Sequence, residues 1–166
     1  MDSRDIIKSH LVSPGFRIIG VSQRLFKRDL LESEKIYSNN EATLFQYSKG
    51  LGATIVCFNF SFPYGFELVN ELRKKGFDSS LFSVNSLTPI NWDKIIENLK
   101  ETRRLVVIDD SRSENLSCYN FLSDALEKCQ IDKKILIKKE FSKEWFFPNS
   151  DQLEINYEKI WQKLQL

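Results

Sequence analysis

Residues 87–112 read LTPINWDKIIENLKETRRLVVIDDSR, and this stretch decides the fold class. Its middle places Trp92, Ile95 and Leu99 at helical spacing, which predicts an amphipathic helix. The next run, RLVVID at residues 104–109, is apolar through its centre, which is typical of a strand covered on both faces of a sheet. A helix that leads directly into such a strand predicts a βαβ unit.

The same alternation of apolar runs and helical patterns continues on both sides of this stretch. Strands that alternate with helices of roughly 10 to 15 residues predict parallel βαβ units, and hence an α/β fold of three layers. Two connections of hairpin length, near residues 48–52 and 139–146, leave room for one antiparallel strand. The predicted strands are residues 41–50, 53–60, 79–86, 104–109 and 133–139, and the predicted helices are residues 62–76, 91–102 and 114–129, with a last helix from about Ile155.

Two of these elements carry more detailed expectations. Lysines flank the apolar centre of residues 133–139, and such lysines favour an edge strand. The helix over residues 114–129 shows one apolar stripe at helical spacing, which we expect to face the core. The stripe consists of Leu116, Tyr119, Leu122 and Leu126.

The first forty residues are less regular. Residues 3–12 favour a helix and FRIIGVS, residues 16–22, favours a short strand. Residues 23–41 are charged and weakly periodic, which is typical of a linker that crosses a surface.

Composition limits the classes of function. The chain has 166 residues, of which 42% are hydrophobic and 28% charged, so we expect a globular protein. A formal net charge of +1 offers no electrostatic footprint for nucleic acid or an anionic membrane. No apolar run approaches the roughly 20 residues of a membrane helix, and the first residues lack the apolar core of a signal peptide. The chain is therefore expected to be cytoplasmic.

The three cysteines do not predict a disulfide framework or a zinc site. They are odd in number, widely spaced and without a CxxC pair. Cys57 and Cys118 lie in apolar or helical patterns, and we expect both thiols to be buried.

The acidic pair Asp109 and Asp110 at a strand end allows two interpretations. It is similar to the phosphoacceptor cluster of a receiver domain, but that site needs a further acid and a lysine on later strands, and too few residues follow. The second interpretation is capping of the following helix by Asp110, Ser111 or Ser113.

Known catalytic and nucleotide-binding motifs are absent: the chain has no GxGxxG, GxxxxGK[ST], GxSxG or HExxH. We therefore expect it to contribute no catalytic, cofactor-binding or metal-binding residue.

Polar residues at the carboxyl ends of strands form the default ligand crevice of an open α/β sheet. An aromatic cluster beside Pro148 favours an interface. The candidate interface or crevice residues are Asn59, Asn85, Asp109, Asp110, Trp145, Phe146 and Phe147.

Four short motifs follow one another in a distinctive order. They are Gly52, Thr54, Ile55 and Val56; then Leu72 and Gly76; then Leu87, Pro89 and Ile90; and then Thr102, Arg104, Val106 and Val107 before the acidic pair. Together they resemble the C-terminal domain of the transketolase superfamily, and within it the beta subunit of the first component of 2-oxoacid dehydrogenases. Residues 1–40 resemble the end of the preceding pyrimidine-binding domain, and residues 41–166 resemble the C-terminal domain itself.

The resemblance implies a fold and a role. The fold would be a three-layer α/β/α domain with a mostly parallel five-stranded sheet. The role would be assembly, as a homodimer or with a subunit that binds thiamin diphosphate. That cofactor and its Mg²⁺ would belong to the parent complex, because other domains of the family hold them. The chain alone would then not be catalytic.

Three departures from the family pattern set this chain apart. Asn91 stands where the family usually has aspartate, and SRSENLS, residues 111–117, replaces a glycine-rich segment. IGVSQRLFK, residues 19–27, lacks the acidic–histidine pair usual at that place. These departures favour a divergent relative, such as one piece of a split transketolase-like enzyme. The polar strand ends near Asn59, Asn85 and Asp109 keep open a different class of function, an autonomous α/β module that binds a small ligand or a signal there.

Overall fold

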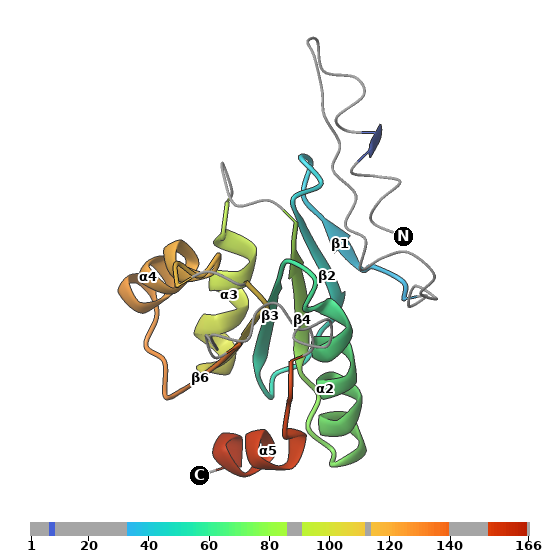
Figure 1. Ribbon diagram of the computed structural model, residues 1–166, viewed down its shortest axis with the longest axis vertical. Helices are drawn as coiled ribbons and strands as arrows, with labels where there is room; N and C mark the ends of the chain where they lie inside the picture. The colour runs from blue at the N-terminus through green and yellow to red at the C-terminus, as the bar shows by residue number, and fades with distance from the viewer. Residues whose placement is uncertain (1–6, 9–32, 86–90, 112–113, 140–152, 166) are drawn as a thin grey trace.

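The computed structural model describes residues 7–8, 33–85, 91–111, 114–139 and 153–165. Six strands in these ranges form one sheet in the order β1-β2-β4-β3-β5-β6 (Figure 1). The elements are β1 (Tyr37–Ser38), β2 (Leu44–Ser48), β3 (Thr54–Phe58), α2 (Phe62–Lys74), β4 (Ser80–Val84), α3 (Asp93–Thr102), β5 (Arg104–Asp109), α4 (Tyr119–Lys128), β6 (Lys133–Lys138) and α5 (Tyr157–Gln165).

The sheet is mostly parallel. Strands β4, β3, β5 and β6 run parallel to one another, whereas β2 is antiparallel to β4 and β1 is antiparallel to β2. The expected α/β/α fold is therefore confirmed, and so are the antiparallel strand and the position of β6 at an edge.

The sheet has six strands where five were expected, because β1 lies inside the stretch predicted to be a linker. Asn39 holds the hairpin between β1 and β2, since its side-chain Oδ1 accepts hydrogen bonds from the backbone N–H of Thr43 (2.9 Å) and Leu44 (3.0 Å). A strand of two residues is too short to show an alternating pattern. Only its partner strand, with Tyr37 opposite Gln46, makes it recognisable.

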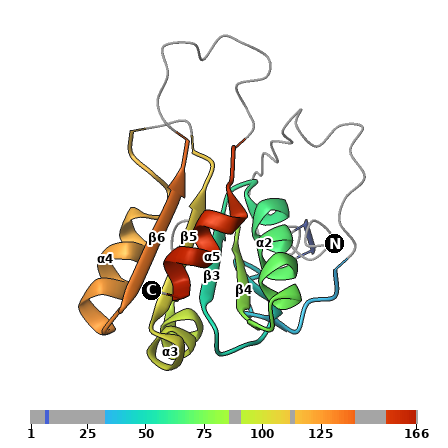
Figure 2. The ribbon, with the colours of Figure 1, turned by 90° about the horizontal axis from the view of Figure 1, so that it is seen from below.

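Two hydrophobic cores lie on the two faces of the sheet. The pleat sends Val56 and Phe58 to the face covered by α3 and α4, and Ile55 and Cys57 to the face covered by α2 and α5 (Figures 1 and 2). Strands β3 and β5 are buried on both faces along their centres, and their sequences there read as apolar runs. β4 is also buried on both faces, but its sequence SLFSV includes the buried Ser80 and Ser83.

Helix α4 is rotated relative to the expected stripe, and it begins at Tyr119, later than predicted. Of the expected stripe, Leu116 and Leu122 are buried, whereas Tyr119 is 43% exposed and Leu126 is 52% exposed. Phe121 and Ala125 are buried in their place. The backbone N–H of Cys118, at the start of the helix, donates a hydrogen bond to Asp109 Oδ2 (2.8 Å). This contact holds the first turn against the end of β5. It favours the rotation that turns the large Phe121 ring toward the sheet.

Candidate functional site

The carboxyl ends of β3 and β5 bring several predicted residues together. Phe58 and Asp109 are paired in the parallel register, so the residues that follow them, Asn59 and Asp110, meet at the same edge. Polar groups at this edge of an open α/β sheet are the usual place for a ligand. We refer to Asn59, Asp109, Asp110, Ser111 and Ser117 as the carboxyl-edge cluster.

Asp109 is the centre of the carboxyl-edge cluster. Its side chain is fully buried, and four donors converge on it. Oδ1 accepts hydrogen bonds from Asn59 Nδ2 (3.1 Å), from Ser111 N (2.9 Å) and from Ser111 Oγ (2.5 Å). Oδ2 accepts the bond from Cys118 N. The carboxylate thus ties the end of β5 to the loop after β3 and to the start of α4.

Asn59 closes the cluster from the solvent side. Its backbone is left-handed, with φ of 58°, a conformation that asparagine adopts more readily than most residues. Besides Asp109, its Nδ2 lies 2.9 Å from Ser111 Oγ and 3.1 Å from Ser117 Oγ. The two serine hydroxyls are themselves 2.9 Å apart. The polar groups of the cluster therefore bond mainly to one another.

Asp110 has a different role from the one predicted. It is buried, and its Oδ1 accepts a hydrogen bond from the backbone N–H of Phe60 (3.1 Å). The start of α4 is held instead by Asp109 and by Ser111, whose Oγ lies 3.3 Å from Ser117 N. The N-cap of α4 is Cys118, which makes no side-chain capping bond, so the predicted capping by Asp110 is not observed. Ser113 lies outside the described residues.

The remaining predicted site residues do not join this cluster. Asn85 follows β4 at the same edge, but it is exposed, and its backbone N–H donates a hydrogen bond to Thr43 O (2.9 Å). Its side chain makes no hydrogen bond to any residue that the structure describes. The aromatic residues Trp145, Phe146 and Phe147 lie outside the described ranges.

Sequence reasoning did not single out Ser61 as a member of this region. Its hydroxyl lies 2.7 Å from the carbonyl oxygens of Phe58 and Ile108, and so bridges the ends of β3 and β5. The available signal was a serine shortly before a proline, which marks a helix start. Ser61 is indeed the N-cap of α2, but its side chain bonds to strand carbonyls rather than to the helix.

Cys57 and Cys118 are buried, as expected from the sequence, and both lie close to this edge. Burial raises the pKa of Cys57 to about 12, and Asp110 adds to the effect. Burial also raises the pKa of Cys118 to about 12, with the Asp109 carboxylate as the second cause. A thiol with so high a pKa is protonated at neutral pH and is a poor nucleophile.

These pKa values predict that stability falls in alkaline solution. A folded-state pKa raised above the reference value of 9.0 means that the native state holds the proton more tightly. The stabilisation of the native state by the Cys57 thiol is fully present below pH 9 and is lost as the pH rises toward 12. Between pH 9 and 11 the free energy of unfolding should fall by about 2 kcal/mol more in wild type than in Cys57→Ala. Urea denaturation at both pH values measures this difference. Equal losses in the two proteins would contradict the assignment.

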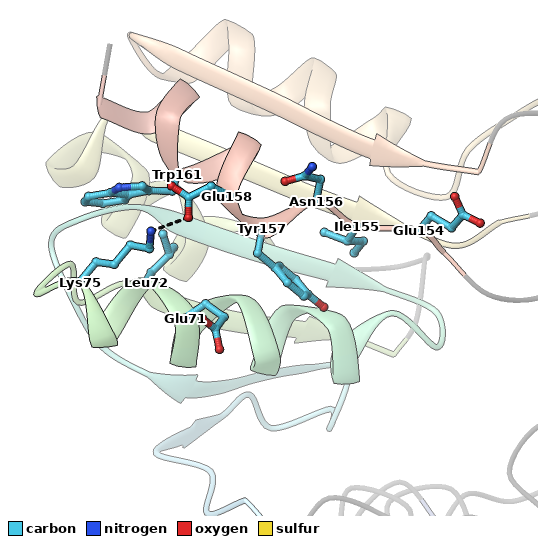
Figure 3. A pocket seen from close by; sticks show the side chains of 9 residues that line it. All are labelled: Glu71, Leu72, Lys75, Glu154, Ile155, Asn156, Tyr157, Glu158 and Trp161. Carbon is cyan, nitrogen blue, oxygen red and sulfur yellow. Dashed lines mark hydrogen bonds and ion pairs between the residues drawn. The ribbon is translucent and has the colours of Figure 1, made fainter.

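A groove of about 620 Å³ lies between α2 and α5, in the helical layer on the face of the sheet away from α3 and α4 (Figure 3). One ion pair joins the two helices across the groove: Lys75 Nζ lies 2.5 Å from Glu158 Oε2. Nearby, Tyr157 donates a hydrogen bond to Glu67 Oε2 (2.7 Å), and burial together with this carboxylate raises the pKa of Tyr157. These contacts describe the docking of α5 on α2 rather than a ligand site.

The docking of α5 predicts a stability effect. Leu164 is fully buried in the core beneath α5, so Leu164→Ala should lower the free energy of unfolding by about 2–4 kcal/mol. The exposed neighbour Gln162, changed to Ala, should alter it by less than about 0.5 kcal/mol. Thermal and urea unfolding of both variants test this. A mild effect of Leu164→Ala would show that α5 contributes little to the fold.

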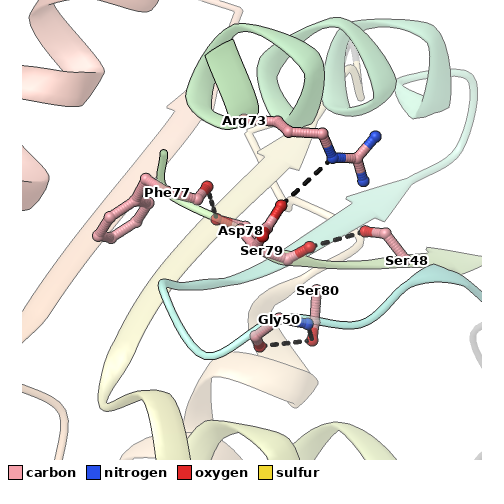
Figure 4. A network of polar contacts seen from close by, with 7 residues as sticks. All are labelled: Ser48, Gly50, Arg73, Phe77, Asp78, Ser79 and Ser80. Atoms are coloured by element: carbon pink, nitrogen blue, oxygen red, sulfur yellow. Dashed lines mark hydrogen bonds and ion pairs between the residues drawn. The ribbon is translucent and has the colours of Figure 1, made fainter. Parts of the chain in front are cut away.

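The amino edge of the sheet is closed by a second polar network (Figure 4). Ser48 Oγ donates a hydrogen bond to Ser79 O (2.7 Å), and Gly50 N donates one to Ser80 Oγ (3.0 Å). A Cβ at Gly50 would lie 2.3 Å from the carbonyl carbon of Asp78, so only glycine permits this approach. The network holds the β2–β3 connection against the start of β4.

Comparison with known proteins gives partial matches. The beta subunits of the pyruvate dehydrogenase E1 component from Rickettsia felis and Rhizobium meliloti are 29% identical over 62 residues and 30% identical over 61 residues. Each match covers 37% of this chain, but only 19% and 13% of the respective relative. The chain thus corresponds to a small part of these relatives. No family model matches it.

A solved structure shows the same fold. A split-gene transketolase, in an inactive beta4 tetramer, superposes with a TM-score of 0.54 and 15% sequence identity over 71% of this chain and 38% of that chain. The resemblance predicted from the motifs is confirmed. The fold is that of a transketolase C-terminal-like domain, and part of the sequence is related to the pyruvate dehydrogenase E1 beta subunit.

Proposed function

We propose that this chain is the C-terminal assembly domain or subunit of a thiamin-diphosphate-dependent enzyme, either transketolase-like or 2-oxoacid-dehydrogenase-like. It would work as a homodimer or together with a subunit that binds the cofactor, and it would not be catalytic alone. The observation that carries the proposal is the likeness of fold to a split-gene transketolase over 71% of the chain. The partial sequence matches to E1 beta subunits support the same assignment.

The residues at the carboxyl edge do not fit thiamin diphosphate and Mg²⁺. Magnesium is held in proteins by carboxylates and phosphate oxygens with room for water, but Asp109 is enclosed and surrounded by four donors. No group of three His, Cys, Asp or Glu side chains that could hold a metal occurs among the described residues. The proposal therefore assigns cofactor binding to a partner subunit.

We extend the proposal to the organisation of the chain and its location. Residues 41–166 would be the assembly domain, and residues 1–40 would be the end of a pyrimidine-binding domain. The protein would act in the cytoplasm. Within the ranges that the structure describes, no helix is both long and apolar enough to cross a bilayer.

Calorimetry and size-exclusion chromatography with light scattering test the proposal. The purified chain should give no heat of binding with thiamin diphosphate and Mg²⁺ at micromolar concentrations. It should dimerise, or elute together with the product of a neighbouring reading frame that encodes a pyrimidine-binding domain. Tight cofactor binding or substrate turnover by the chain alone would overturn the proposal. A monomer that responds to a small ligand would favour the autonomous binding module instead.

A further inference from the structure

We draw no further inference here: the strongest candidate, the exposed apolar stripe that Tyr119 and Leu126 form on α4, carries none because nothing in the structure shows what covers it.

Discussion

Gly65→Ala should destabilise the protein by about 2 kcal/mol, although alanine is the better helix former by about 1 kcal/mol. Gly65 lies in α2 where the helix crosses β3, and it is buried. A Cβ added there would lie 2.2 Å from Cys57 Sγ and 3.0 Å from Leu81 Cδ1. The first distance is far inside van der Waals contact, so α2 or the sheet must move, and this cost exceeds the gain in helix propensity.

Unfolding experiments measure this effect directly. The melting temperature of Gly65→Ala should fall by about 4–8 °C for a chain of this size. Ser123→Ala, at an exposed position of α4, should change the free energy of unfolding by less than about 0.5 kcal/mol. It controls for the effect of adding alanine to a helix surface.

A double-mutant cycle identifies the cause. Cys57→Ala removes the sulfur that the new Cβ would meet, so Gly65→Ala should cost at least about 1 kcal/mol less in that background. Leu81 Cδ1 remains close, so the rescue should be incomplete. If Gly65→Ala is as stable as wild type, or if its cost is unchanged by Cys57→Ala, the close packing of α2 on β3 is not as described.

Asp109→Ala should lower the free energy of unfolding by about 3 kcal/mol, because it leaves several donors without their charged acceptor. The backbone N–H groups of Ser111 and Cys118 both donate to this carboxylate. Asp109→Asn keeps the shape but replaces one oxygen by an amino group that faces donors, so a smaller loss of about 1–2 kcal/mol is expected. Asp78→Asn, at an exposed surface ion pair with Arg73, should cost less than about 1 kcal/mol.

The local consequences of Asp109→Ala distinguish its role. Hydrogen exchange at the amides of Ser111 and Cys118 should accelerate more than exchange in β3, because the carboxylate holds the start of α4. A catalytic or phospho-accepting aspartate would behave differently, since functional residues are commonly retained at a cost in stability. An Asp109→Asn variant as stable as wild type, or more so, would therefore contradict the structural role and revive the receiver-like interpretation.

Local sequence patterns predicted most of the elements. The apolar run of β5 and the helical spacing of α3 depend on neighbouring residues, and both elements appear close to their predicted bounds. The burial of Trp92, Ile95 and Leu99 was predicted on the same basis. The stripe predicted for the α4 region was half right, because Leu116 and Leu122 are buried whereas Tyr119 and Leu126 are exposed.

The candidate site was predicted in position but not in detail. Asn59 and Asp109 were expected at the carboxyl edge because they follow parallel strands, and the structure brings them into contact. Asp109 and Asp110 point to opposite faces of the sheet. The sequence could not show which aspartate holds α4, because only the tertiary structure decides which face α4 covers. The bridging role of Ser61 also depends on Ile108, a residue far away in the chain.

The sequence by itself determined the alternation of strands and helices, since hydrophobic periodicity is a property of neighbouring residues. It also determined the fold class, because parallel βαβ units follow from that alternation. Only the tertiary structure decided the pairing of β1, the rotation of α4 and the choice of Asp109 as its anchor. Each of these is settled by contacts between residues distant in the chain, where burial and hydrogen bonding outweigh local preference.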